Sequence, residues 1–119
     1  MAKIPLHIEQ SEPIPGIILV SASGAILLGP ESECIEELVR EQLGAGKLTF
    51  VFDLTAVTRM DSTGIGRFIA AYNMILKAQG ALRMVCVPGL VLKSFQVTRL
   101  DSVFPLFPSL SDDMESVLK

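Results

Sequence analysis

The cluster Asp61-Ser62-Thr63, followed by Gly64 and Gly66, holds the residue types best suited to chemistry in this sequence. Carboxylate and hydroxyl oxygens accept hydrogen bonds from the first unpaired N–H groups of a helix, so Asp61 and Ser62 can cap a helix that begins here. The two glycines leave the first turn of that helix nearly bare of side chains. Because a helix N-terminus carries partial positive charge, an exposed hydroxyl beside it is well placed to carry a phosphate. Helix capping alone is the simpler interpretation of the same residues.

Other chemistries have weaker support in the sequence. Asp53 and Asp61 are candidates for an acid–base pair, but a strand end and a helix cap explain them equally well. His7 is the single histidine, which leaves little material for a Ser-His-Asp triad or a histidine-rich metal site. Cys34 and Cys86 lack metal-ligand spacing, so we expect reduced, buried thiols and a cytoplasmic protein. We therefore predict no catalytic residue, no metal site and no cofactor.

Composition limits the class of protein. A chain of 119 residues with 50% hydrophobic and 19% charged residues predicts one folded domain. The net charge of -3 gives no electrostatic reason to expect direct binding of nucleic acid. We expect no membrane span, because no apolar run approaches the roughly 20 residues that a spanning helix needs. We also expect no signal peptide at the N-terminus.

The N-terminal part of the sequence predicts a hairpin. Alternating apolar and polar residues indicate a half-buried strand at Ile4–Ile8, and the apolar run Ile17–Val20 indicates a more buried partner strand. Two prolines and a glycine predict a turn over Ser11–Gly16. Ser21–Gly24 predicts either a turn or a bulge, after which Ala25–Leu28 can continue the strand.

Helices and strands alternate after this hairpin. Apolar residues at helical spacing or in short continuous runs predict these elements. We expect Asp53 to end its strand and a short loop to lead from it to the Asp61 cluster. The pattern predicts an α/β fold with a mixed sheet, as a single domain over residues 1–119 with about five strands and about four helices. The expected helices span Glu31–Leu43, Gly64–Ala78, Leu90–Arg99 and Asp112–Leu118, and the further strands span Leu48–Leu54, Leu82–Val87 and Val103–Phe107.

The stretch Phe52-Asp-Leu-Thr-Ala-Val-Thr-Arg-Met-Asp-Ser-Thr-Gly-Ile-Gly66 resembles the signature of the STAS domain, the fold of anti-sigma factor antagonists. That signature is a strand ending in Asp-Leu, a small variable loop, and Asp-Ser-[Ser/Thr]-Gly-[Leu/Ile]-Gly at the start of a helix. The segments Gly80–Val85 and Phe95–Phe107 are also similar to the family. The resemblance therefore covers residues 16–119.

The resemblance implies a bacterial phosphoprotein that regulates transcription through protein–protein interaction and is not an enzyme. In phosphorylated members, the first hydroxyl residue after the Asp is the acceptor, which is Ser62 here, with Thr63 as the runner-up. The unphosphorylated protein binds an anti-sigma factor that is also a serine kinase, which frees a sigma factor; phosphorylation releases the partner, and a phosphatase resets the switch. The implied partner-binding residues are Asp61, Ser62, Thr63, Gly64, Ile65, Gly66 and Leu27.

Two residues depart from the family pattern. Leu27 stands where the family's antagonists carry an Asp that faces the kinase, so Leu27 either makes an apolar contact with a different partner or simply packs. Arg99 replaces the usual glycine before Leu100. Three alternative functions stay open: a STAS scaffold subunit of a signalling assembly that works as a homo-oligomer, an accessory subunit of a membrane transporter, and an enzyme or nucleotide-binding protein.

Overall fold

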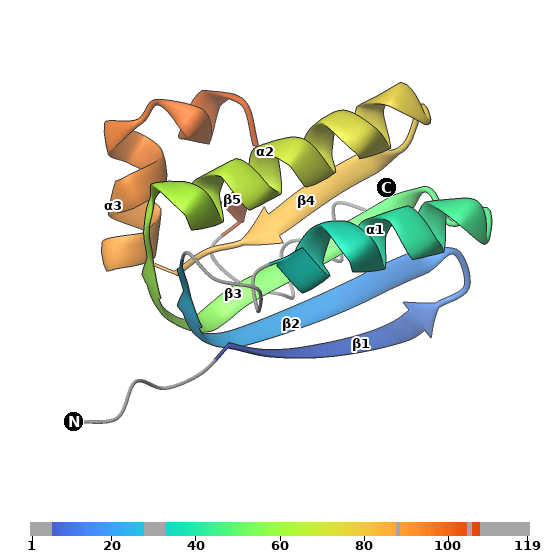
Figure 1. Ribbon diagram of the computed structural model, residues 1–119, viewed down its shortest axis with the longest axis horizontal. Coiled ribbons are helices and arrows are strands. Elements are labelled where there is room, and N and C mark those ends of the chain that lie inside the picture. Colours follow the sequence, from blue (N-terminus) through green and yellow to red (C-terminus); the bar gives the residue numbers. More distant parts are fainter. Residues whose placement is uncertain (1–5, 28–32, 88, 105, 108–119) are drawn as a thin grey trace.

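The computed structural model describes residues 6–27, 33–87, 89–104 and 106–107. Within them, five strands form one sheet in the order β1-β2-β3-β4-β5, in which β1 is antiparallel to β2 and the other neighbours are parallel. The predicted mixed α/β fold is therefore confirmed (Figure 1). The strands are β1 (His7–Ile14), β2 (Ile17–Ile26), β3 (Thr49–Met60), β4 (Ala81–Val85) and β5 (Leu106–Phe107), and the α-helices are α1 (Cys34–Gly44), α2 (Ser62–Lys77) and α3 (Leu90–Val97).

Helices α1 and α2 lie side by side across one face of the sheet (Figure 1). Side chains on a strand alternate between the two faces, so Phe50, Phe52 and Leu54 of β3 point together into the core beneath these helices. The ring of Phe52 packs edge-to-face against Phe68 of α2, with 5.5 Å between ring centroids. Val51 is also buried, in a smaller cluster that includes Ile17 and Val85. Burial on both faces explains why β3 begins as a nearly continuous apolar run.

The predicted hairpin is confirmed, but its turn is shorter than the predicted Ser11–Gly16 and lies at Pro15 and Gly16, because β1 continues to Ile14. The pairing of β1 with β2 shifts register between Ser11 and Ile14, which lets the strand pass Pro13. The carboxylate of Glu12 accepts hydrogen bonds from the Gly16 backbone N–H (2.7 Å) and the Lys47 ammonium group (2.9 Å). Ser11 and Pro13 therefore belong to the edge strand β1, and only Pro15 and Gly16 belong to the turn.

Strand β2 runs unbroken through Ser21–Gly24. Of the two alternatives predicted for this segment, the turn is therefore wrong and the bulge is confirmed. Its pairing with β3 shifts register between Ser21 and Ser23 and again between Gly24 and Ala25. Each irregularity increases the local bend of the strand without ending it. Strand β2 thereby continues to Ile26.

Strand β3 does not end near Asp53 but reaches Met60, so the predicted short loop before Asp61 is wrong. Its second half pairs with the second half of β2, where Ile26 lies opposite Met60. Asp53 accepts hydrogen bonds from the backbone N–H (3.0 Å) and hydroxyl (2.6 Å) of Thr55. Backbone pairing with β2 therefore extends the strand beyond the apolar residues that mark it in the sequence.

The helices agree with the predicted positions to within a few residues. Helix α1 begins at Cys34, α2 runs from Ser62 to Lys77, and α3 is followed by a short 3-10 turn, η2 (Leu100–Ser102). Residues 28–32, where the first helix was expected to begin, and the predicted helix Asp112–Leu118 lie outside the described residues.

Helix α3 is followed by an arginine in the left-handed backbone region. Arg99 has φ 61° and ψ 19°, and its N–H donates to the Gln96 carbonyl (3.0 Å). A residue just past a helix C-terminus commonly adopts this conformation, and it is usually glycine because a Cβ atom is unfavourable there. The departure from the family pattern at Arg99 therefore keeps the turn and adds strain to it.

We expect Arg99→Gly to raise the free energy of unfolding by about 0.5–1 kcal/mol, because glycine removes the left-handed penalty but gains entropy in the unfolded chain. Urea-induced unfolding measures the change. Gln96→Gly is the matched control, since Gln96 is exposed within α3 and should lose about 1 kcal/mol on the helix-propensity scale. A loss of stability in both variants would contradict the strain at Arg99.

Candidate functional site

The Asp61-Ser62-Thr63 cluster lies where the carboxyl ends of parallel strands meet the start of α2. Strand β2 ends at Ile26, strand β3 ends at Met60 beside it, and α2 begins at Ser62. Carboxyl ends of parallel strands meet at one edge of a sheet, and α/β folds commonly bind ligands and partners there. The fold thus places the cluster at an accessible edge.

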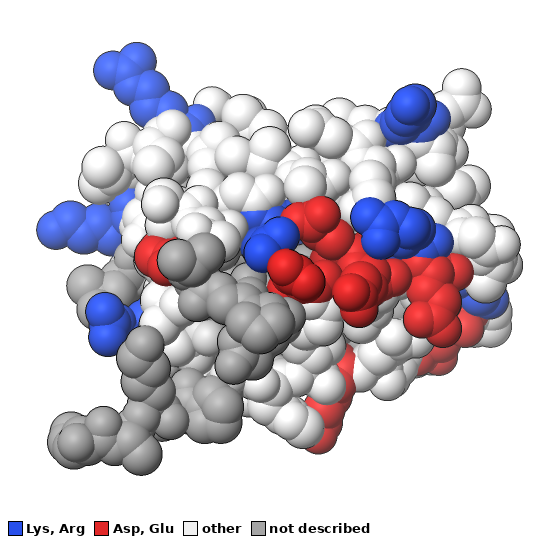
Figure 2. Space-filling view, viewed as in Figure 1, with Lys and Arg blue, Asp and Glu red and all other residues white. Residues whose placement is uncertain are grey.

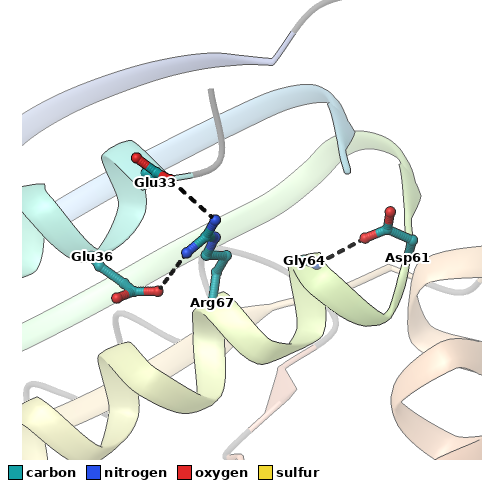
Figure 3. Close-up of polar contacts among 5 residues, drawn as sticks. All are labelled: Glu33, Glu36, Asp61, Gly64 and Arg67. Atoms are coloured by element: carbon teal, nitrogen blue, oxygen red, sulfur yellow. Dashed lines mark hydrogen bonds and ion pairs between the residues drawn. The ribbon is translucent and has the colours of Figure 1, made fainter. Parts of the chain in front are cut away.

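Asp61 is the N-cap of α2. Its backbone is extended (φ -99°, ψ -175°), and its Oδ1 atom accepts from the Gly64 backbone N–H at 2.9 Å (Figure 3). The Ile65 N–H donates to the Asp61 carbonyl at 3.1 Å, which closes the first turn. The predicted capping role of Asp61 is confirmed. Because Asp61 makes the capping hydrogen bond, the cap does not depend on the hydroxyl of Ser62. Ser62 is exposed at the first helical position, whereas Thr63 is half-buried.

Gly64 lets the start of α2 approach the end of β2. A Cβ atom at this position would lie 2.5 Å from the Ile26 carbonyl oxygen and 2.7 Å from the Cγ atom of Met60. The backbone N–H of Asp61 donates to the same Ile26 carbonyl at 3.3 Å. Gly66, in contrast, is exposed and has open space where a Cβ would lie. The fold therefore requires the first glycine of the cluster but not the second.

Arg67 ties the first turns of α2 to α1. Its guanidinium lies 3.2 Å from the Glu36 carboxylate and 3.8 Å from that of Glu33, and Figure 3 shows the side chain reaching from α2 toward both. The Arg67 side chain is only 22% exposed, so this ion pair is better shielded than one on the open surface. The start of α2 is held by β2 on one side and by α1 on another.

Leu27 and Ile65 lie at the same end of the sheet as Ser62. Leu27 directly follows Ile26, the residue whose carbonyl binds the Asp61 N–H, and both Leu27 and Ile65 are half-buried. The structure therefore brings together the residues that the sequence suggests for partner binding. Whether a partner contacts them stays a prediction.

A groove of about 550 Å³ lies between the start of α2 and helix α3. The start of α2 contributes Asp61, Ser62 and Ile65 to its lining. Strand β3 contributes Arg59, and α3 contributes Lys93 and Val97. We call this feature the Ser62 groove. Nothing in the sequence marks Arg59 or Lys93 as part of a site, although the four-residue spacing of Lys93 and Val97 places both on one face of α3.

Asp53 and His7, the other candidates for chemistry, lie outside the Asp61-Ser62-Thr63 cluster and have partners elsewhere. Asp53 binds Thr55, whereas Asp61 caps α2, so the two carboxylates do not form a pair. His7 is on the edge strand β1, with its ring nitrogen 3.2 Å from Glu9. The residues that the structure describes contain no group of three or more His, Cys, Asp or Glu side chains suited to a metal ion. None of the helices they form is long and apolar enough to cross a membrane.

Both cysteines are free, as predicted, but only Cys86 is buried, whereas Cys34 is half-buried. Burial raises the pKa of the Cys86 thiol to about 11. Burial and the nearby Glu37 carboxylate raise the pKa of the Cys34 thiol. Both thiols are consequently protonated and poorly nucleophilic near neutral pH.

Comparison with known proteins gives the family. The model of the STAS domain matches residues 10–112, which is most of the chain, so this protein belongs to the STAS domain family. No curated protein matches the sequence significantly.

Solved structures share the fold. An anti-sigma factor antagonist from Mycobacterium paratuberculosis is 24% identical with a TM-score of 0.81, covering 97% of this chain and 96% of the other. The anti-sigma factor antagonist SpoIIAA in its unphosphorylated form is 12% identical with a TM-score of 0.73, covering 94% and 97%. The Bacillus cell fate determinant SpoIIAA in its phosphorylated form is 14% identical with a TM-score of 0.74, covering 93% and 99%.

The two glycines of the cluster should respond oppositely to alanine. We expect Gly64→Ala to lower the free energy of unfolding by about 2 kcal/mol or more, since overpacking against backbone forces a shift. Gly66→Ala should raise it by up to about 1 kcal/mol, because alanine is the better helix former and meets open space. Urea-induced unfolding of both variants tests this. Equal effects would contradict the close approach of β2 and α2.

Proposed function

We propose that this chain is a phosphorylation-controlled anti-sigma factor antagonist and that Ser62 is its phosphate acceptor. In its unphosphorylated form it binds an anti-sigma factor that is also a serine kinase, and the sigma factor is freed. Phosphorylation of Ser62 by that kinase releases the partner, and a phosphatase restores the binding form. In this role the chain is a kinase substrate and a binding protein, not an enzyme.

One observation carries the proposal: within a STAS domain, Ser62 presents an exposed hydroxyl at the first position of α2 while its neighbour Asp61 caps the helix. A helix cap needs one such side chain, so capping by Asp61 leaves the hydroxyl of Ser62 available for another use. Thr63 is half-buried and is therefore a poorer substrate for a kinase, which must surround the hydroxyl it phosphorylates. It is the second choice of acceptor.

A phosphate on Ser62 is compatible with the fold. It adds a charge of about -1.5 to -2 beside the N-terminus of α2, where the helix dipole and unpaired N–H groups favour an anion. The similarity of this chain to SpoIIAA structures of both the unphosphorylated and the phosphorylated form supports the same expectation. The switch then acts on the surface and does not require the domain to change shape.

The same phosphate opposes a bound partner. A protein surface packed against Ser62 must remove water from the phosphate, and the Asp61 carboxylate beside it adds a second negative charge. Gly66 is exposed and carries no side chain, so a partner can lie close to the backbone of α2 at this turn. Leu27 offers apolar surface at the same end of the sheet, where we expect the partner to present an apolar side chain.

The first test compares the proteins captured from source cells by tagged wild type, Ser62→Ala and Ser62→Asp, identified by mass spectrometry. We expect wild type and Ser62→Ala to retain an anti-sigma serine kinase and Ser62→Asp to retain at least about tenfold less, a difference of about 1.4 kcal/mol in binding. Equal capture by Ser62→Asp would contradict the switch. Capture of other STAS proteins or of transporter subunits by all three would favour the scaffold or accessory function instead.

The second test uses the phosphate itself, because an aspartate carries less charge than a phosphoserine. The purified kinase and ATP should phosphorylate wild type and Thr63→Ala on Ser62, located by mass spectrometry, and leave Ser62→Ala unmodified. Phosphorylated wild type should then fail to bind the kinase in size-exclusion chromatography. Phosphate on Thr63 in the wild type would show that the acceptor is misassigned.

A further inference from the structure

The Ser62 groove combines apolar surface with positive charge. Val97 on its α3 side is 73% exposed, and Ile65 on its α2 side is half-buried. An apolar side chain this exposed gains free energy when another apolar group covers it. The groove can therefore bind an apolar side chain of another molecule.

Two basic side chains from different elements line this groove. Arg59 comes from the end of β3 and Lys93 from α3, and both are exposed. Neither forms an ion pair with a carboxylate in the part of the chain that the structure describes. The third charged residue of the lining, Asp61, directs its Oδ1 atom to the Gly64 N–H. Counting Arg59, Lys93 and Asp61, the groove has a net charge of +1 in a chain whose net charge is -3.

The distribution of charge on the surface agrees with this count. Figure 2 shows basic side chains projecting from the edge of the molecule that holds α3 and the start of α2, whereas acidic side chains gather over α1. A ligand that matches the groove carries negative charge beside an apolar group. A free anion matches the charges but leaves the exposed Val97 uncovered.

We infer that the Ser62 groove binds a protein segment of the partner in which an apolar side chain is flanked by carboxylates. The apolar side chain lies against Val97 and Ile65, and the carboxylates lie near Arg59 and Lys93. The inference names the chemistry of the partner in the proposed function and rests on that function only for the role of phosphate.

Phosphorylation of Ser62 changes the sign of this groove. The groove carries +1 before modification, from two basic residues and Asp61, and a phosphoserine adds about -1.5 to -2. The net charge becomes negative, so the groove repels the carboxylates that it attracted. The basic residues thus explain why one modification both removes an attraction and adds a repulsion.

The probe is a synthetic peptide with leucines flanked by glutamates, titrated into the isotopically labelled full chain and followed by backbone NMR shifts. We expect shifts concentrated at Lys93–Thr98 and at the start of α2, weakening with salt. The same peptide with lysine in place of glutamate should cause none of them. Inorganic phosphate is the third ligand, and shifts as large as those with the acidic peptide would identify an anion site and overturn the inference.

Substitutions of exposed residues test which side chains bind the peptide. Arg59→Glu and Lys93→Glu should each weaken peptide binding at least about fivefold, whereas Lys77→Glu, at the far end of α2, should leave it unchanged. Val97→Asp should weaken it as well, and Leu76→Asp, at an exposed leucine away from the groove, is its control. Unchanged binding in Lys93→Glu and Val97→Asp would overturn the inference.

Ser62→Asp tests the link to phosphorylation with the same peptide and no kinase. We expect weaker binding than to wild type, and equal binding would overturn the change of sign. Because these titrations use no cellular partner, a failed kinase capture refutes the proposed function without affecting them. Conversely, if the captured kinase binds Lys93→Glu as tightly as wild type, the result supports the proposed function and overturns the inference that the Ser62 groove binds the partner.

Discussion

The close contact between the end of β2 and the start of α2 is the constraint on which the site depends. The Ile26 carbonyl oxygen accepts a hydrogen bond from the Asp61 N–H, and it lies only 2.5 Å from where a Cβ atom of Gly64 would be. Since α2 begins at this contact, the direction of its first turn follows from it, and so does the exposure of Ser62. The ion pair of Arg67 with Glu36 then fixes α2 against α1. A charge placed on Ser62 is consequently presented on a rigid surface, which suits a signal read by another protein.

Local signals explain what could be predicted from the sequence. The apolar run at Phe50–Leu54 and the helical spacing after Gly64 correctly indicate a buried strand and the helix behind it, because both patterns follow from burial of one segment. Asp61 is recognisable as a cap since its carboxylate and the N–H group it binds are three residues apart. The turn predicted over Ser11–Gly16 is confined to Pro15 and Gly16, because Ser11 and Ile14 pair with Leu19 and Ile17 of β2.

Contacts between distant segments explain what could not be predicted. The second half of β3 contains the exposed residues Thr55, Thr58 and Arg59, which resemble a loop in composition and are held in a strand by backbone pairing with β2. The Ser62 groove is likewise assembled from Arg59 and Lys93, which are far apart in the sequence and belong to different elements. No local pattern marks either residue as part of a site, so only the folded chain shows that they stand beside Ser62.

On the face that Figure 2 shows, the separation of acidic side chains over α1 from basic ones near α3 also gives the surface a gradient of charge. Such a gradient turns an approaching charged protein before the two surfaces touch and so raises the fraction of productive encounters. At physiological ionic strength its reach is limited to about 8 Å, the Debye length. The acidic partner that we propose would therefore be oriented only in the last step of its approach, and the proposed phosphate on Ser62 would weaken this orienting effect before any contact has formed.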